Sequence, residues 1–136
     1  MIQKTNLILY VKDQQKSRDF YEKILQQAPT LDVPGMTEFR LSENTTLGLM
    51  PAAGICRLLA GKIPDPRSAD GVPGAELYLT VADPAAWHQR ALLAGARGLQ
   101  PLMQMNWGDR AAYSADPDGN VLAFASSPSD SLPEKL

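Results

Sequence analysis

The chain has 136 residues, of which 44% are hydrophobic and 21% charged, and its formal net charge is −2. This length and composition predict one compact globular chain, either a single unit or two small modules that share a core. The slightly acidic balance excludes the basic surface that nucleic-acid binding requires. Cys56 and His88 are the only cysteine and histidine, which excludes an internal disulfide and any site built from several Cys or His ligands.

Neither a membrane span nor an export signal is expected. The longest uncharged stretch, 44–56, contains Gly and Pro and is too short to cross a bilayer. Residues 1–11 alternate like a strand and lack the small-residue cleavage site of a signal peptide. We therefore expect a cytoplasmic protein with no membrane partner.

The first half of the chain predicts a strand, a helix and a hairpin. Residues 6–11 (NLILYV) alternate between two faces, with Asn6, Ile8 and Tyr10 on one of them. Asp13 can cap the helix that follows, which must end before Pro29. The segment 36–51 then predicts a hairpin with a polar tip at 42–46.

The second half repeats this order, with residue 76 in the place of residue 6. Residues 76–81 (ELYLTV) put Glu76, Tyr78 and Thr80 on one face. Asp83 can cap a helix that stops at Gly95. A further hairpin over 110–125 turns at 116–120, where Pro, Gly and Asn are strong turn residues.

This repeat predicts four segments. They are a first module at 1–50, a connecting segment at 51–75, a second module at 76–125 and a flexible polar tail at 126–136. The connecting segment is rich in Pro, Gly and Ala, and a short strand over 55–59 is one option within it. Each module has a sheet face that it cannot bury alone, so we expect the two modules to close around something.

Two segments resemble the vicinal oxygen chelate superfamily, which includes glyoxalases, extradiol dioxygenases, fosfomycin resistance enzymes and bleomycin resistance proteins. They are NLILYVKDQQKSRDFYEKIL at 6–25 and WGDRAAYSADPDGN at 107–120, within a likeness that spans 6–124. The resemblance implies an α+β fold of two βαβββ modules, whose curved mixed sheets form a ligand-binding cleft. It also implies a homodimer, either module-paired or domain-swapped.

Metal-using members of this family bind their ion through the start of each module's first strand and through the last strand of the module. The resemblance places these positions at Asn6, Glu76 and Ala123, and the first-module counterpart of Ala123 at Leu49. Alanine and leucine have no donor atom, whereas a Lewis-acid site needs about three protein ligands. The chain is therefore expected to work without a cofactor. The alternative is a divalent metal, for which Glu76 is the one carboxylate ligand.

The same resemblance points to a site for a small molecule. Tyr113 and Trp107 are expected to share strand alternation with Ala123, and Phe39 to lie on the same side as Ile8 and Tyr10. A carboxylate among aromatic rings favours a cationic or amine-bearing partner. The expected ligand-binding residues are Asn6, Ile8, Tyr10, Phe39, Leu49, Glu76, Tyr78, Trp107, Tyr113 and Ala123.

Three functions follow from these expectations, so whether the chain is an enzyme stays open. The favoured one is a metal-free protein that binds and sequesters an antibiotic or aromatic metabolite, similar to the bleomycin resistance proteins, with no catalytic residue. The alternative is a metal-dependent lyase or oxidoreductase of the glyoxalase or dioxygenase type. The third is metal-free catalysis, with Glu76 as general base and Tyr113 as hydrogen-bond donor.

Overall fold

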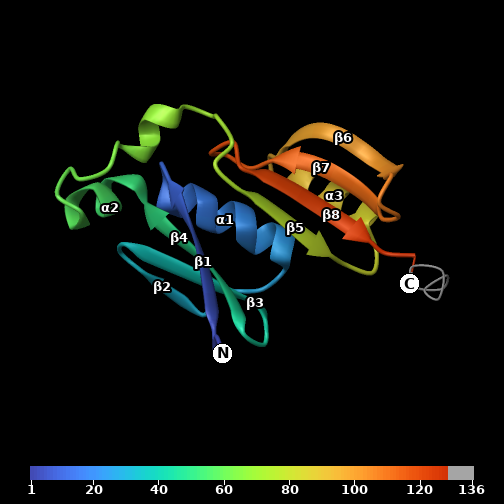
Figure 1. Cartoon of the computed structure of the whole chain (residues 1–136), viewed down its shortest axis with the longest axis horizontal. Coiled ribbons are helices and arrows are strands. Elements are labelled where there is room, and N and C mark those ends of the chain that lie inside the picture. Colours follow the sequence, from blue (N-terminus) through green and yellow to red (C-terminus); the bar gives the residue numbers. More distant parts are fainter. Residues whose placement is uncertain (129–136) are drawn as a thin grey trace. The chain divides into compact units, whose positions relative to one another are not determined.

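A computed structural model describes residues 1–128 of the chain. The chain divides into two compact units between Val72 and Pro73, each with one four-stranded sheet. Each unit contains a strand, a helix and three further strands in that order (Figure 1). This confirms the α+β fold of two βαβββ modules. Of the tail expected at 126–136, residues 129–136 lie outside the described part.

The first unit contains β1, α1 and then β2 to β4 in chain order. The sheet order is β1-β4-β3-β2, with β1 parallel to β4 and the other pairs antiparallel. As predicted, α1 begins after Asp13, whose carboxylate accepts a hydrogen bond from the Lys16 amide at 3.0 Å. The bounds are β1 Thr5–Val11, α1 Gln14–Leu25, β2 Leu31–Val33, β3 Met36–Ser42 and β4 Thr45–Pro51.

One face of this sheet packs against α1 and forms the core of the unit. The side chain of Gln14 on α1 donates to the Thr37 hydroxyl at 2.9 Å, which identifies that face on β3. Phe39 has the same strand parity as Thr37, and Leu49 is the strand partner of Thr37. Phe39 and Leu49 are both fully buried, together with Leu9, Val11, Leu47 and the α1 residues Phe20 and Ile24.

The opposite face carries Ile8, whose partner on β4 is Gly48. The expectation that Phe39 lies on the side of Ile8 and Tyr10 is therefore wrong, and Leu49 is likewise on the helix-facing side. The sequence comparison aligned the first hairpin to the second with an offset that is wrong by one residue. A shift of one residue exchanges the two faces of a strand. The first-unit counterpart of Ala123 is Gly48, which also has no donor atom.

The segment after β4 is helical. Helix α2 (Ala52–Leu58) starts directly after Pro51, and a 3-10 turn, η1 (Pro66–Ala69), follows. The option of a strand over 55–59 is therefore wrong. Ala52 and Ile55, one helical turn apart, are the buried residues of α2. This burial of one side stabilises a helix in a segment whose composition suggested only a connection.

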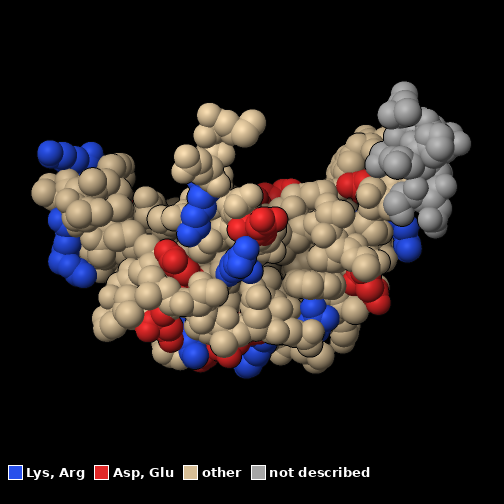
Figure 2. Space-filling model, turned by 90° about the horizontal axis from the view of Figure 1, so that it is seen from below, with Lys and Arg blue, Asp and Glu red and all other residues tan. Residues whose placement is uncertain are grey.

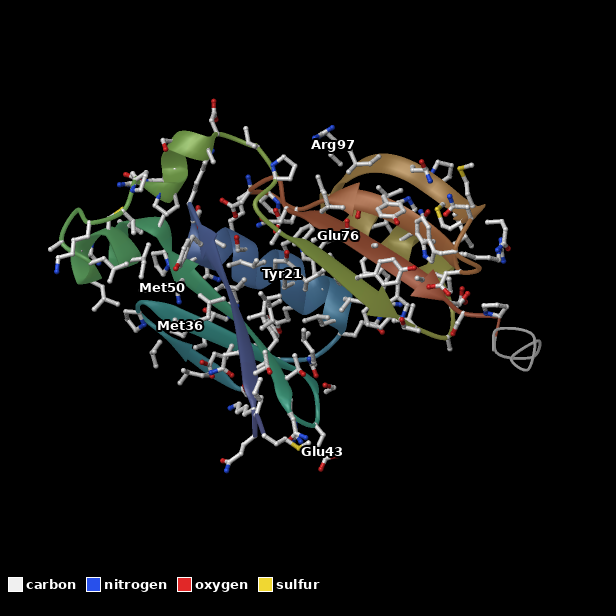
Figure 3. All side chains as sticks on the ribbon, viewed as in Figure 1. Tyr21, Met36, Glu43, Met50, Glu76 and Arg97 are labelled. Atoms are coloured by element: carbon white, nitrogen blue, oxygen red, sulfur yellow. The ribbon has the colours of Figure 1, made fainter. Side chains whose placement is uncertain are left out.

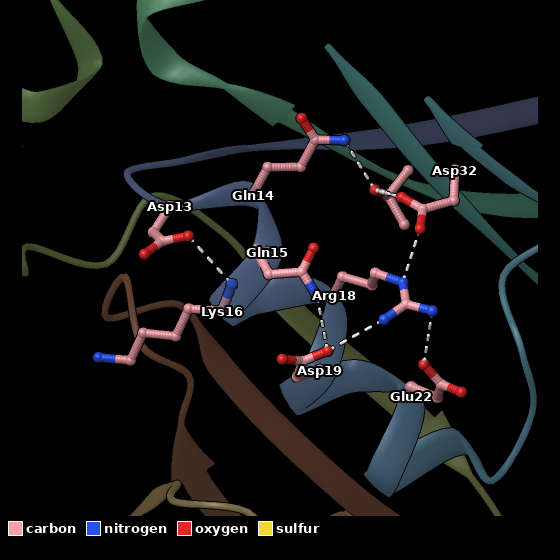
Figure 4. Close-up of polar contacts among 9 residues, drawn as sticks. Asp13, Gln14, Gln15, Lys16, Arg18, Asp19, Glu22 and Asp32 are labelled. Atoms are coloured by element: carbon pink, nitrogen blue, oxygen red, sulfur yellow. Dashed lines mark hydrogen bonds and ion pairs between the residues drawn. The ribbon is translucent and has the colours of Figure 1, made fainter. Parts of the chain in front are cut away.

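Ion pairs on the outer side of α1 hold the edge strand β2. Arg18 contacts Asp32 of β2 at 2.7 Å, Asp19 at 3.1 Å and Glu22 at 3.3 Å (Figure 4). These side chains are partly exposed, so each pair adds little stability by itself. Elsewhere, Lys and Arg side chains are mixed with Asp and Glu over the surface seen in Figure 2.

The second unit contains β5, α3 and then β6 to β8. Its sheet order is β5-β8-β7-β6, with β5 parallel to β8. Asp83 caps α3 through the Ala86 amide at 3.2 Å, and Gly95 follows the helix with φ 108°, as predicted. The bounds are β5 Glu76–Thr80, α3 Pro84–Leu93, β6 Arg97–Gln104, β7 Arg110–Ala115 and β8 Val121–Ser126.

A buried carboxylate fixes the turn between β7 and β8. The side chain of Asp116 accepts hydrogen bonds from the backbone amides of Asp118 and Asn120, both at 2.9 Å. The side-chain amide of Asn120 donates to the same carboxylate at 3.1 Å. The turn therefore sets the register of β8 against β7. Within residues 1–128, no helix is long and apolar enough to span a membrane.

Candidate functional site

The candidate site is the face of the second sheet that α3 does not cover. The helix side is identified by Phe124, whose ring lies 5.8 Å from that of Trp87 on α3. The other side, called here the open face, carries Tyr78, Ala123 and Tyr113 in one row, because Tyr78 pairs with Ala123 and Ala123 with Tyr113. Glu76 is two residues before Tyr78, so it lies on the same face, as the strand alternation predicts.

Trp107 reaches this face from a loop. It lies in the turn between β6 and β7, so the expectation that it shares strand alternation with Tyr113 is wrong. Its indole N–H donates to the Tyr78 hydroxyl at 3.0 Å, and that hydroxyl donates to Asp109 Oδ2 at 2.6 Å. We call this hydrogen-bonded chain of Trp107, Tyr78 and Asp109 the latch. Since β5 and β6 are opposite edges of the sheet, the latch fastens the 105–109 loop to the far strand.

The loop is also tied internally. The amide of Met105 donates to the Asp109 carbonyl at 2.7 Å, and Gln104 Nε2 donates to the Gly108 carbonyl at 3.0 Å. Gly108 has φ 104°, a conformation that favours glycine. These contacts present the side chains of Trp107 and Asp109 on a preformed loop. The sequence analysis missed Asp109 as a site residue, and the only local signal was its position beside Trp107 and Gly108.

Ala123 lies between the two tyrosine positions of this face. It has no exposed surface, and its partners on the two neighbouring strands are Tyr78 and Tyr113. The remaining open-face positions of β7 and β8 are alanines apart from Val121, and Ala111 and Ala125 are fully buried. The centre of the sheet is therefore apolar, and polar atoms come from the side chains around it.

The two tyrosines are in an environment that favours the neutral phenol. Burial raises the pKa of Tyr78, and its hydrogen bond to Asp109 raises that pKa further. Burial also raises the pKa of Tyr113, and the nearby charges of Glu76 and Asp109 add to the shift. Both hydroxyls therefore keep their protons at neutral pH.

The open face also contains polar groups without partners. Within residues 1–128, neither the Glu76 carboxylate nor the Tyr113 hydroxyl makes a hydrogen bond or ion pair. Figure 3 labels Glu76 together with Arg97, which occupies the same row at the opposite edge of the sheet. Three strand spacings separate their backbones, about 14 Å, so Arg97 does not neutralise Glu76.

In the first unit, the corresponding face carries Asn6, Ile8 and Tyr10, with Ile8 and Tyr10 40% and 42% exposed. A Cβ atom at Gly48 would lie 3.1 Å from Ile8 Cγ1 and 3.2 Å from Met36 Sδ. Glycine thus allows close packing of these side chains over β4. The structure places Asn6, Ile8 and Tyr10 together, apart from Phe39 and Leu49 on the helix side.

The metal that the family resemblance implies does not fit the residues present. Glu76 offers a carboxylate and Asn6 a weak amide oxygen, whereas Gly48 and Ala123 offer no donor atom. Ala123 also lies between two tyrosine-bearing strand positions. Residues 1–128 contain no group of three or more His, Cys, Asp or Glu side chains placed to hold an ion.

Known proteins resemble this chain along most of its length. The family model described as Glyoxalase/Bleomycin resistance protein/Dioxygenase superfamily matches residues 4–124. An uncharacterized protein from Mycobacterium bovis is 34% identical over 118 residues, which cover 82% of this chain and 75% of that protein.

Solved structures share the fold. A glyoxalase-related enzyme from Fulvimarina pelagi has a TM-score of 0.79 at 22% identity, covering 94% of this chain and 90% of its own. A glyoxalase/bleomycin resistance protein/dioxygenase from Nocardioides has a TM-score of 0.73 at 20% identity, covering 90% of this chain and 82% of its own.

Proposed function

Because the chain belongs to the Glyoxalase/Bleomycin resistance protein/Dioxygenase superfamily, we propose that it binds and sequesters a small aromatic molecule without a metal ion. The observation that carries this proposal is the environment of Ala123. The strand position that supplies a carboxylate in metal-using relatives is here a buried alanine between Tyr78 and Tyr113.

The open face has the composition of a small-molecule site. Buried alanine side chains underlie this face, and the rings of Tyr78, Tyr113 and Trp107 come from three different segments of the second unit. Such sites combine apolar and aromatic contacts with a few fixed polar groups. The latch supplies preorganisation, which lowers the entropic cost of binding.

The charges favour a cationic ligand. Glu76 lies on the same face as Tyr113, and Asp109 is held at that face by the hydrogen bond that it accepts from the Tyr78 hydroxyl. A cation can contact a carboxylate and the face of an aromatic ring at the same time. The proposed ligand is therefore an aromatic amine, either an antibiotic or a metabolite. We further propose that the protein that binds it is a cytoplasmic homodimer.

Two measurements test the absence of a metal. Elemental analysis of the purified protein should find no stoichiometric metal, and Ni, Zn, Mn and Fe(II) salts should leave the melting temperature unchanged. A ligand that binds only the native state raises its stability. Stoichiometric metal or a clear rise in Tm with one of these ions would instead support the metal-dependent enzyme.

Tryptophan fluorescence tests ligand capture. Titration with a panel of aromatic cationic antibiotics should give saturable quenching in the parent chain and in Trp87→Phe, which changes the tryptophan on the helix side. Trp107→Phe should remove most of the quenching, because that ring lies at the open face. Quenching that depends on Trp87 alone would contradict this location of the site.

A further inference from the structure

We propose that the open face recognises the N–H donors of a primary or secondary ammonium group through Glu76 and Tyr113, and so discriminates against quaternary ammonium. This inference rests on the proposed function, and it adds the chemical class of the cation. It follows from which polar atoms of the site already have partners and which do not.

The Tyr78 hydroxyl already has two hydrogen-bond partners within the protein. It donates its only proton to Asp109 at 2.6 Å and accepts the indole N–H of Trp107 at 3.0 Å. The same bonds use Asp109 Oδ2 and the single donor of Trp107. The latch therefore provides ring surface and negative charge, and few of its hydrogen-bonding groups remain for a ligand.

The side chains of Glu76 and Tyr113 remain available for hydrogen bonds to a ligand. Neither makes a hydrogen bond to any residue of the described range 1–128. An ionised carboxylate accepts hydrogen bonds only, and a phenol oxygen can accept as well as donate. Glu76 on β5 and Tyr113 on β7 lie on the same face of the sheet, with the one strand β8 between them. Both can therefore receive N–H groups from one ligand.

The register supports this convergence. Tyr113 shares its row with Tyr78, and Glu76 is in the next row on the same face. A ligand ring that stacks on the exposed ring of Tyr78 would place a short alkyl ammonium toward Glu76, two residues earlier on the same strand. The cation would then meet the carboxylate at one end of the aromatic surface.

Full methylation of the ammonium group removes the N–H donors that Glu76 and Tyr113 recognise. A quaternary ammonium keeps its charge and its attraction to aromatic rings but has no N–H group. It would displace water from Glu76 and Tyr113 without replacing the lost hydrogen bonds, and an unmade hydrogen bond to a charged group is costly. The expected effect is about a tenfold or greater loss of affinity.

A matched pair of probes tests the inference. We would titrate the ¹⁵N-labelled chain with phenethylammonium and with its N,N,N-trimethyl derivative, and follow the indole N–H signals of Trp107 and Trp87 by NMR. Trp87 packs on Phe124 on the helix side and serves as an internal control. We expect phenethylammonium to shift the Trp107 signal with about tenfold higher affinity than the trimethyl probe.

Variants identify the groups responsible. Glu76→Gln keeps the shape of the side chain and should bring the two affinities close together. Tyr113→Phe should reduce the difference while keeping the ring. Glu43→Gln removes the same charge from the hairpin tip of the first unit, labelled in Figure 3, and should preserve the parent difference. An unchanged Tm would verify the fold of each variant.

The outcomes separate this inference from the proposed function. Equal affinities of the two probes for the parent chain would overturn the recognition of N–H donors and leave aromatic cation capture intact. A preference that survives in Glu76→Gln would also overturn it. Failure of both probes to shift Trp107 would contradict the proposed function as well.

Discussion

Substitution of Tyr78 by phenylalanine tests whether the latch holds the 105–109 loop. The change removes one hydroxyl and with it the bonds to Asp109 at 2.6 Å and from Trp107 at 3.0 Å. A hydrogen bond to a charged group contributes about 1.5–3 kcal/mol and a neutral one about 1 kcal/mol. Tyr78 and Trp107 are 37% and 55% exposed, so in the variant water replaces part of both hydrogen bonds. We therefore expect a net loss of about 1–2 kcal/mol.

Urea unfolding measures this loss. With an m value of about 2 kcal/mol/M, the midpoint should fall by about 0.5–1 M, and the Trp107 indole N–H should exchange faster with solvent. Tyr10→Phe is the matched control for stability, because Tyr10 is 42% exposed and makes no hydrogen bond within residues 1–128. Equal midpoints for the two variants, with unchanged indole exchange, would refute the stabilising role of the latch.

Two further predictions concern the core and the tyrosines. Phe39→Ala should lower the free energy of unfolding by about 3–5 kcal/mol, because its ring is fully buried; a small loss in urea unfolding with weakened probe binding would instead place Phe39 on the ligand side. Burial raises the pKa of Tyr78 and Tyr113, so their stabilising effect is complete below about pH 10 and declines as the pH rises through the raised values. The Tyr78→Phe/Tyr113→Phe variant should therefore lose less stability than the parent as the pH rises above about 10, and an equal loss would contradict the shifts.

Local patterns in the sequence were sufficient to predict most elements. Alternation in 6–11 and 76–81 matches β1 and β5, and the caps at Asp13 and Asp83 match the starts of α1 and α3. These signals depend on neighbours a few residues away, so they act without tertiary contacts. The placement of Glu76, Tyr78 and Ala123 on one face also followed from alternation and from the turn at 116–120.

The register of the first hairpin needed the tertiary structure. Thr37, Phe39 and Leu49 face α1 because β3 and β4 pair with Thr37 opposite Leu49. The pairing of β3 and β4 is irregular near Ser42. A comparison of the two hairpins by residue type therefore gives a register that is wrong by one residue. A shift of one residue exchanges the faces, so the sequence alone could not assign Phe39 and Leu49.

The latch was also decided by the tertiary structure. Trp107 and Asp109 are separated from Tyr78 by 29 and 31 residues, and no local pattern relates them. They meet because the sheet order places β5 at one edge while the loop between β6 and β7 reaches over from the other. The sequence by itself determined that Ala123 cannot bind a metal, since alanine has no donor atom. Only the folded chain decided which aromatic and acidic side chains surround it, because hydrogen bonds between distant segments depend on strand order and register.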